Sequence, residues 1–225
     1  MAKVKSIIII PARGGSKRLP GKNLKMLAGK ALIEYSLDYA KINANDDIDI
    51  VVTTNDSEIK TFAKSEGVQV IDRPEEISMD DSTTVSALKH VLQNLNGFYE
   101  NVILLQPTNP LRPTNLLNEA LEIFSEGNYE SLMTVSLNDK KLGKIEGDRF
   151  IPYTYKMGQR SQDLEPLYFE NGLLYITKSE IVLKNQILGE KNYPMIIDHP
   201  FASVDIDTQE DMNYAEFIAK TYLDE

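Results

Sequence analysis

Short apolar runs alternate along this chain with stretches in which apolar residues recur every three or four positions. The first pattern is typical of strands buried on both faces, and the second of helices that pack one face on a sheet. The apolar runs predict strands at residues 6–10, 49–54, 68–71, 101–106, 131–136 and 173–177. Strands that alternate with helices in this way indicate βαβ units around a mostly parallel sheet, an α/β fold.

Helices are predicted where the apolar residues follow helical spacing. These stripes lie at residues 32–39, 59–63, 85–95, 117–124 and 209–222. Asn55 is a candidate cap for the second helix, and the Asp-Asp-Ser group at 80–82 for the third. Gly67 and Gly127 stand where the second and fourth helices should end.

Residues 138–170 interrupt this rhythm. The stretch is rich in Lys, Tyr, Asp, Glu and Gln, and as a plain loop it would be too long for a compact domain. We therefore expect one domain over residues 1–225, with 138–170 as an insertion that forms its own hairpin or short helices. Its polar and aromatic composition predicts a subunit-contact arm and hence a homodimer.

The composition excludes several classes of protein. The chain has no cysteine, which rules out disulfides, thiolate metal sites and a cysteine nucleophile. No apolar run reaches the length of a membrane span, because the four isoleucines at 7–10 end at Pro11. The first residues lack the long hydrophobic stretch of a signal peptide, so we expect a cytoplasmic protein without a membrane partner.

Charge is distributed unevenly along the chain. The formal net charge is -10, yet the first acidic residue is Glu34, and eight cations precede it. These cations are Lys3, Lys5, Arg13, Lys17, Arg18, Lys22, Lys25 and Lys30. Positive charge gathered at one loop of an acidic protein favours a small polyanion such as a nucleoside triphosphate, whereas a long nucleic acid would need a broader basic surface.

The loop after the first strand has the features of a phosphate cradle. Gly14, Gly15 and Ser16 let backbone N–H groups approach phosphate oxygens, and Arg13 and Lys22 supply charge. The loop is not a Walker A motif, because Ser16 occupies the position of the glycine that stands six residues before the lysine. No G-x-G-x-x-G dinucleotide fingerprint occurs either.

Residues 10–17, Ile-Pro-Ala-Arg-Gly-Gly-Ser-Lys, with Lys22-Asn23, resemble the opening motif of the acylneuraminate cytidylyltransferases, the CMP-sialic acid synthetases. Residues 18–22 are also similar to the related CMP-Kdo synthetases. The resemblance implies a Rossmann-like, glycosyltransferase-A-like nucleotidyltransferase fold with a small dimerisation insertion. It assigns the nucleotide to Ala12, Arg13, Gly14, Gly15, Ser16, Lys22 and Asn23.

Further segments match the family in the same order. The Arg73-Pro-Glu-Glu segment resembles the one whose arginine contacts cytosine, and guanidinium donors suit the O2 and N3 acceptors of that base. Asp81 and Ser82 belong to a polar stretch that resembles the base and ribose contacts, although a helix cap would explain it equally well. In Gln106-Pro-Thr-Asn-Pro-Leu-Arg112, Gln106 corresponds to the family's acceptor-sugar contact, and Arg112 is either functional or a structural ion-pair residue.

The acceptor sugar should meet residues 171–175 as well. The segment resembles an Asn-Gly-Ala-x-Tyr motif and assigns Asn171 and Tyr175 to the sugar. Leu173 replaces the commoner alanine, and Glu170 stands where arginine is frequent, which leaves the identity of the sugar open. Arg160, in the insertion, is expected to face the acceptor's carboxylate. The family also implies that Lys144 reaches the partner subunit's active site.

Asp205 and Asp207 form the candidate metal site. Aspartates at i and i+2 of an extended segment point to the same face, so both carboxylates can bind one Mg²⁺ (or Mn²⁺). The segment Ser-Val-Asp-Ile-Asp also resembles the family's metal-binding motif.

These observations predict a cytidylyltransferase that joins CTP and an N-acylneuraminate-like nonulosonic acid, with Arg13, Lys22 and Asp207 as catalytic residues. Rivals with related chemistry are synthetases of CMP-Kdo or of CMP-legionaminate and CMP-pseudaminate. A sugar-1-phosphate nucleotidylyltransferase shares the glycine loop but not segment 171–175. A nucleotide-binding regulator without turnover is the rival from another class.

Overall fold

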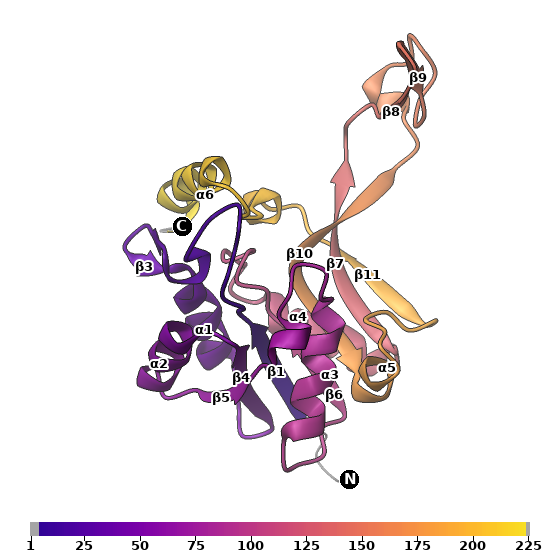
Figure 1. Ribbon diagram of the computed structural model, residues 1–225. Coiled ribbons are helices and arrows are strands. Elements are labelled where there is room, and N and C mark those ends of the chain that lie inside the picture. Colours follow the sequence, from indigo (N-terminus) through magenta and orange to yellow (C-terminus); the bar gives the residue numbers. More distant parts are fainter. Residues whose placement is uncertain (1–4, 224–225) are drawn as a thin grey trace.

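The computed structural model describes residues 5–223, so Lys3 lies outside the described residues. Its centre is a seven-stranded sheet in the order β11-β7-β10-β6-β1-β4-β5 (Figure 1). The strands are β1 (Ser6–Pro11), β4 (Ile48–Thr54), β5 (Gln69–Asp72), β6 (Asn101–Leu104), β7 (Ser131–Asn138), β10 (Leu167–Lys178) and β11 (Asn192–Ile196). Four of the six strand pairings are parallel, and only β10 runs antiparallel to its neighbours β6 and β7. The predicted mostly parallel α/β sheet is therefore confirmed.

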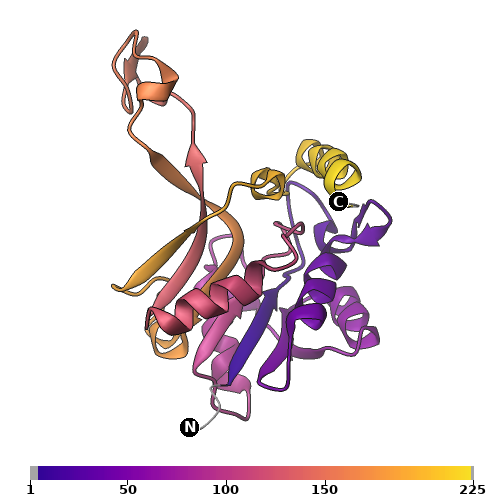
Figure 2. The ribbon, with the colours of Figure 1, turned by 180° about the vertical axis from the view of Figure 1, so that it is seen from behind.

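Helices cover both faces of this sheet (Figures 1 and 2). They are α1 (Leu32–Asn43), α2 (Ser57–Ser65), α3 (Thr84–Asn94), α4 (Leu116–Glu126), α5 (Ser179–Leu183) and α6 (Gln209–Tyr222). Ile8 and Ile10 of β1 belong to the core formed with α1, α2 and α4, while Ile7 and Ile9 belong to the core formed with α3 and α5. Each of these four isoleucines is fully buried and contributes about 1.5–3 kcal/mol. The apolar run thus marks a strand that is covered on both sides.

A third apolar cluster lies beside the end of β1. It joins α6 to Leu19 of the glycine-rich loop and to Val204 and Ile206, which flank Asp205. The N-terminus of α6 is fixed by a capping box between Thr208 and Asp211. Burial of these alternating apolar residues holds the glycine-rich loop and the aspartate segment on a common support.

Some local predictions were wrong. The cap of α2 is Asp56, whose carboxylate accepts the N–H groups of Glu58 and Ile59, and not Asn55. The cap of α3 is Thr83 and not the 80–82 group. In both cases the polar run is longer than a cap requires, so the residues before the cap are available for other contacts.

Strand β11 was not predicted, and its sequence explains why. It contains Pro194, and only Met195 of its five residues is buried. A proline cannot donate a ladder hydrogen bond, so it is tolerated here because β11 lies at the edge of the sheet.

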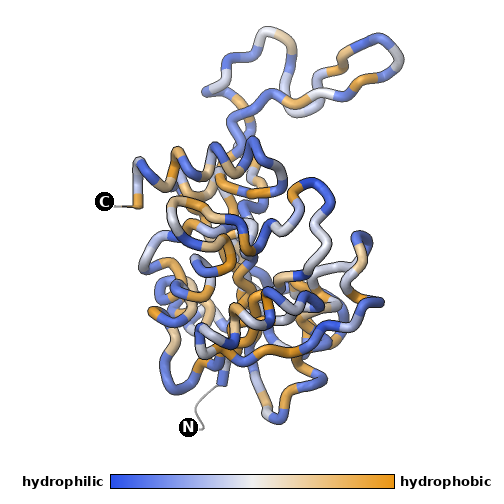
Figure 3. The backbone as a smooth tube through the Cα atoms, turned by 60° about the vertical axis from the view of Figure 1, so that its left-hand side comes forward, coloured by the Kyte–Doolittle hydropathy of each residue, from blue (hydrophilic) through white to orange (hydrophobic). Residues whose placement is uncertain are grey.

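Strands β7 and β10 continue past the sheet and carry an arm that projects from the body (Figure 1). The arm contains the hairpin β8 (Gly143–Glu146) and β9 (Arg149–Pro152) and a short 3-10 helix at Ser161–Asp163. This confirms the hairpin expected within residues 138–170. Hydropathy alternates along the arm (Figure 3), and its exposed apolar side chains include Ile145, Tyr153 and Met157.

Candidate functional site

Two hollows meet where β1 and β6 end. The first, here the loop cavity, has a volume of about 180 Å³, and the second, the β10 cavity, about 610 Å³. The loop cavity is lined by Pro11, Arg13, Ser16, Lys22, Asn23, Arg73, Ser82, Thr84, Gln106, Pro107 and Thr108. The β10 cavity is lined by Gln106, Thr108, Asn109, Lys140, Phe169, Glu170, Asn171, Gly172, Tyr175, Ala202, Ser203, Asp205 and Asp207. Gln106 and Thr108 line both, so a ligand in one cavity can touch a ligand in the other.

The glycine-rich loop packs closely against the turn that follows β4. The N–H of Gly14 donates to Oδ1 of Asn55 at 2.9 Å, and a Cβ on Gly14 would lie 2.8 Å from the Asp56 carboxylate. The buried side chain of Asn23 donates to the carbonyl of Arg13 at 3.0 Å. Asn23 therefore holds the shape of the loop, and Gly14 is required for its close approach to Asp56.

Two guanidinium groups line the loop cavity. Arg73 is 7% exposed and donates through Nε and Nη2 to the carbonyl of Ile77. Burial, and secondly the positive charge of Arg13, lower the pKa of Arg73. The two cations are thus close enough to repel each other, an arrangement that an anionic ligand would stabilise.

Two carboxylates neutralise the cations of the loop from opposite sides. Asp80 accepts from Arg13 Nη2 at 2.9 Å and pairs with Lys17 Nζ at 2.5 Å. Asp207 pairs with Lys22 Nζ at 2.9 Å and with Arg18 Nη2 at 2.5 Å.

Lys22 is the more buried of the two cations on Asp207. Its side chain is only 12% exposed, and its Nζ also donates to the carbonyl of Ile206 at 2.9 Å. A polyanion entering the loop would compete with Asp80 and Asp207 for the same donors.

Asp205 and Asp207 both line the β10 cavity, as their spacing predicts. Partial desolvation, and secondly the negative charge of Asp207, raise the pKa of Asp205, while the Thr108 hydroxyl lowers it by donating a hydrogen bond. Residues 5–223 contain no group of three or more His, Cys, Asp or Glu side chains arranged around one metal position. Two mutually repelling carboxylates beside a phosphate-sized cavity nevertheless suit Mg²⁺, which takes few protein ligands and completes its shell with phosphate and water oxygens.

A bulge in β10 shapes the wall of the β10 cavity. The pairing register with β7 shifts between Glu170 and Tyr175, and the Thr134 hydroxyl bonds both backbone groups of Leu174 in place of a regular ladder. In an unbroken strand, residues five apart face opposite sides. The bulge brings both side chains to one cavity, where the Tyr175 hydroxyl donates to Glu170 Oε2 at 2.9 Å. Burial, and then the charge of Glu170, raise the pKa of Tyr175.

Asparagine side chains hold this bulge in place. Asn171 is buried, donates to Ser136 Oγ at 3.0 Å and accepts from the N–H of Leu173. Asn109 donates to the carbonyls of Asn171 and Val204, both at 3.0 Å. The bulge and the aspartate segment are therefore tied to the same amide.

Arg112 is a buried structural residue. It donates to the carbonyls of Leu173 at 2.7 Å and Gln106 at 2.8 Å and to the Ser36 hydroxyl at 3.1 Å. Burial lowers the pKa of Arg112 to about 10, so it stays charged at neutral pH. Its partners are neutral oxygens and not the ion-pair partner considered from sequence.

The structure brings most of the predicted site residues together. Arg13, Ser16, Lys22, Asn23, Arg73, Ser82 and Gln106 line the loop cavity, and Gln106, Asn171, Tyr175, Asp205 and Asp207 line the β10 cavity. Gly14, Gly15 and Asp81 line an adjoining hollow beside Asp80. Ala12 is 1% exposed, and its N–H bonds Thr53, so any ligand contact by Ala12 would have to be made through its carbonyl.

Arg160 is the exception. It pairs with Asp163 at 2.7 Å on the projecting arm and lines neither cavity of its own chain. Its expected contact with the acceptor's carboxylate is not made within this chain and stays a prediction.

Sequence reasoning missed Asp80, Thr108 and Lys140 as site residues. Asp80 and Thr108 lie inside segments that the sequence assigned to the site. Sequence reasoning did not predict what each of the two residues contacts. Lys140 offered no signal, because its position depends on how the arm leaves β7.

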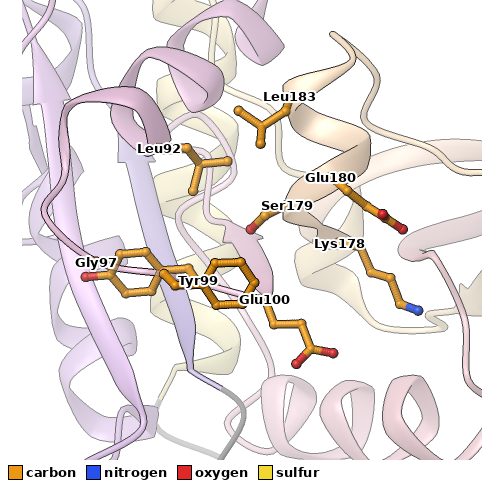
Figure 4. A pocket seen from close by; sticks show the side chains of 9 residues that line it. Leu92, Gly97, Tyr99, Glu100, Lys178, Ser179, Glu180 and Leu183 are labelled. Carbon is orange, nitrogen blue, oxygen red and sulfur yellow. The ribbon is translucent and has the colours of Figure 1, made fainter.

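A separate hollow of about 410 Å³ lies near the start of β6, where Leu92, Tyr99 and Leu183 approach Ser179 (Figure 4). The cations of the glycine-rich loop and the Asp205–Asp207 pair line the other end of the sheet. We therefore place the functional site there.

Known proteins with similar sequences are cytidylyltransferases. A family model described as Cytidylyltransferase matches residues 7–224. The N-acylneuraminate cytidylyltransferase of Streptococcus agalactiae serotype III (strain NEM316) is 34% identical over 215 residues, which cover 92% of this chain but 52% of that protein. The chain therefore spans about half the length of that relative.

Two further proteins match along nearly their whole length. The CMP-N,N'-diacetyllegionaminic acid synthase of Legionella pneumophila is 32% identical, with 93% of this chain and 94% of that protein covered. The solved structure of a CMP:2-keto-3-deoxy-manno-octonic acid synthetase complexed with CTP superposes with a TM-score of 0.71, covering 96% of this chain and 99% of that one. Its sequence is 16% identical, so it supports the fold alone. No helix within residues 5–223 is long and apolar enough to cross a membrane.

Proposed function

Because the chain belongs to the cytidylyltransferase family, we propose that it transfers CMP from CTP to an N-acylneuraminate-like nonulosonic acid and releases diphosphate. The observation that carries the proposal is the junction of the two cavities. One is lined by Arg13, Arg73 and Lys22, the other by Asp205 and Asp207, and Gln106 belongs to both. An anionic nucleotide and a polar sugar acid can therefore meet at one point.

In this reaction the anomeric hydroxyl oxygen of the sugar attacks the α-phosphorus of CTP. A new phosphorus–oxygen bond forms, the bond to diphosphate breaks, and the hydroxyl proton is released to solvent. Arg13 and Lys22 bind the triphosphate and stabilise the negative charge that grows on the departing diphosphate. Arg73 offers donors for the cytosine, and its fixed hydrogen bonds to Ile77 keep the guanidinium in one orientation.

Asp205 and Asp207 would hold Mg²⁺ (or Mn²⁺), which when bound neutralises phosphate charge and aligns the triphosphate. Asp207 is paired with Lys22 and Arg18. Phosphate oxygens can take over both cations, which would free this carboxylate for a metal ion. The loop is thus prepared for an exchange of partners when CTP enters.

We also propose a cytoplasmic homodimer. The arm exposes Ile145, Tyr153 and Met157, and apolar side chains on a projecting arm favour contact with a second subunit. Lys144, which lies over the Tyr153 ring at 4.4 Å, and Arg160 would then approach the partner subunit's active site. Light scattering at assay concentrations tests this assembly, and a fully active monomer would contradict it.

The nature of the acceptor decides between this proposal and its rivals. Purified protein with magnesium should release diphosphate from CTP in preference to UTP, ATP or GTP, and only when a nonulosonic acid is present. Sialic, legionaminic, pseudaminic and Kdo acids should be tested with each nucleotide. Preferential turnover of Kdo would support the Kdo synthetase, and turnover of a sugar-1-phosphate alone would overturn the family chemistry. Tight CTP binding without turnover of any acceptor would support a regulator.

A further inference from the structure

The β10 cavity contains a carboxylate for which the proposed reaction has no use. Glu170 lines the cavity together with the aspartate pair but belongs to the opposite wall, at the root of the arm. Within residues 5–223 no three acidic or histidine side chains are grouped around one metal position, so Glu170 does not join the aspartate pair as a third ligand. Its side chain is therefore available to the sugar.

Glu170 is exposed, and a hydrogen bond from Tyr175 orients its carboxylate. Its Oε2 accepts the Tyr175 hydroxyl at 2.9 Å, a contact that exists only because the bulge brings both residues to the same face. The bulge in turn depends on Gly172 and on the hydrogen bonds of Asn171 and Asn109. Oε2 of Glu170 is thus occupied by the Tyr175 hydroxyl. The other carboxylate oxygen, Oε1, can accept a hydrogen bond from a ligand.

A carboxylate with this geometry selects for hydrogen-bond donors. An ionised glutamate can only accept hydrogen bonds, and with Asp205 and Asp207 it makes three carboxylates in a lining whose one cation is Lys140. The carboxylate of an acceptor sugar is repelled from Glu170 and favoured near Lys140. The group that meets Glu170 must instead carry an N–H or O–H.

Apolar surface in the same cavity distinguishes these two donors. Phe169 and Ala202 also line it. An acylamino substituent combines an N–H donor with a methyl group that can use such surface, whereas a hydroxyl has no apolar part. The acylamino group therefore fits both the Glu170 carboxylate and the apolar surface of Phe169 and Ala202.

We infer that Glu170, oriented by Tyr175, is a specificity-determining residue that recognises the N–H of an acylamino group on the acceptor sugar. This inference rests on the proposed function, because it names the acceptor chemistry of that same site. It assigns Glu170 to selection between acceptors and gives it no part in phosphoryl transfer.

The test compares two acceptors that differ at one atom, where one carries an acetamido group and the other an acetoxy group, which keeps the methyl but lacks the N–H donor. The wild-type protein should favour the acetamido sugar in kcat/KM by about tenfold, since the ester oxygen of the acetoxy group cannot donate to Glu170 and a hydrogen bond to a charged group is lost. Glu170→Gln should remove most of this preference by raising the KM of the acetamido sugar, with little change in the KM of CTP. In that variant Tyr175 keeps the amide oxygen, so the NH₂ group opposes the substrate N–H.

Two further variants keep the test decisive. Glu170→Ala removes the acceptor group without adding a donor and should also abolish the preference. Glu180→Gln removes an exposed carboxylate just beyond the other end of β10 and should keep it. Thermal unfolding checks that each variant folds, and Glu170→Gln preserves side-chain size.

The outcomes separate the two proposals. If both Glu170 variants turn over CTP with an unchanged acetamido preference, this inference is overturned and the proposed function stands. If wild-type protein turns over no nonulosonic acceptor with CTP, the proposed function fails, and the inference falls with it.

Discussion

Gly172→Ala should damage stability and the acceptor site together. Gly172 has φ +74°, a left-handed conformation that is unfavourable for residues with a Cβ. An added Cβ would lie 2.5 Å from Oδ1 and 2.8 Å from Cγ of Asn109. Asn109 is 2% exposed and cannot swing into solvent. Either this amide or the bulge must move.

The magnitude follows from the contacts at risk. The left-handed conformation costs about 1 kcal/mol with a Cβ present. Displacing Asn109 endangers its hydrogen bonds to the carbonyls of Asn171 and Val204, and each buried group left unpaired costs about 1–3 kcal/mol. We expect a loss of roughly 3–7 kcal/mol, or about 6–28 °C in Tm for a chain of this length. The KM of the acceptor should rise more than that of CTP, because the bulge residues line the β10 cavity and not the loop cavity.

Gly67→Ala is the matched control. Gly67 has the same φ of +74°, but its Cβ would meet nothing within 4 Å. It should therefore lose only the conformational cost, roughly 1 kcal/mol, with normal kinetics. Chemical denaturation of both variants isolates the clash. A difference between them of less than about 0.5 kcal/mol would refute the argument that Asn109 and the bulge form a rigid unit.

Three other predictions address the cations and carboxylates. Arg112→Met should destabilise the protein by about 2–4 kcal/mol in urea unfolding, because it leaves two buried carbonyls unpaired, and Arg112→Lys should recover only part of this loss. Asp80→Asn should lower the KM of CTP roughly two- to fivefold at low salt, since it releases Arg13 from an exposed ion pair, and an unchanged KM would show that the pair does not compete with phosphate. Asp207→Asn should reduce kcat by several orders of magnitude even at saturating magnesium, whereas near-wild-type turnover would remove Asp207 from the proposed metal site.

The fold could be predicted largely because its main strands are buried on both faces. A run such as Ile7–Ile10 has one physical explanation at that length, and the helices between such runs follow from spacing. Strand β11 escaped prediction because an edge strand needs neither continuous apolar residues nor a full set of N–H donors. The caps of α2 and α3 were misplaced because several adjacent polar residues can each serve as a cap, and only the backbone path selects one.

Residues of the candidate site could be selected from sequence by type and spacing, and their roles stay predictions, whereas their three-dimensional partnerships could not be predicted. Charge and spacing in the sequence are enough to single out Arg13, Lys22 and the Asp205–Asp207 pair as candidates. The partnership of Glu170 with Tyr175 could not be read, since a separation of five residues predicts opposite faces and only the bulge reverses this. Sequence patterns assume regular strands, so they fail where a strand is irregular.

The charge arrangement supports the proposed triphosphate site in an acidic protein. Four loop cations are matched by Asp80 on one side and Asp207 on the other, so the loop is held in place by the same groups that a ligand must displace. Exposed pairs of this kind are individually weak, and salt screens them. Phosphate oxygens offer more acceptors at higher charge density than the two carboxylates, so the exchange favours binding. The released Asp207 then lies beside the bound triphosphate, which is the place where a divalent cation can be shared between protein and substrate.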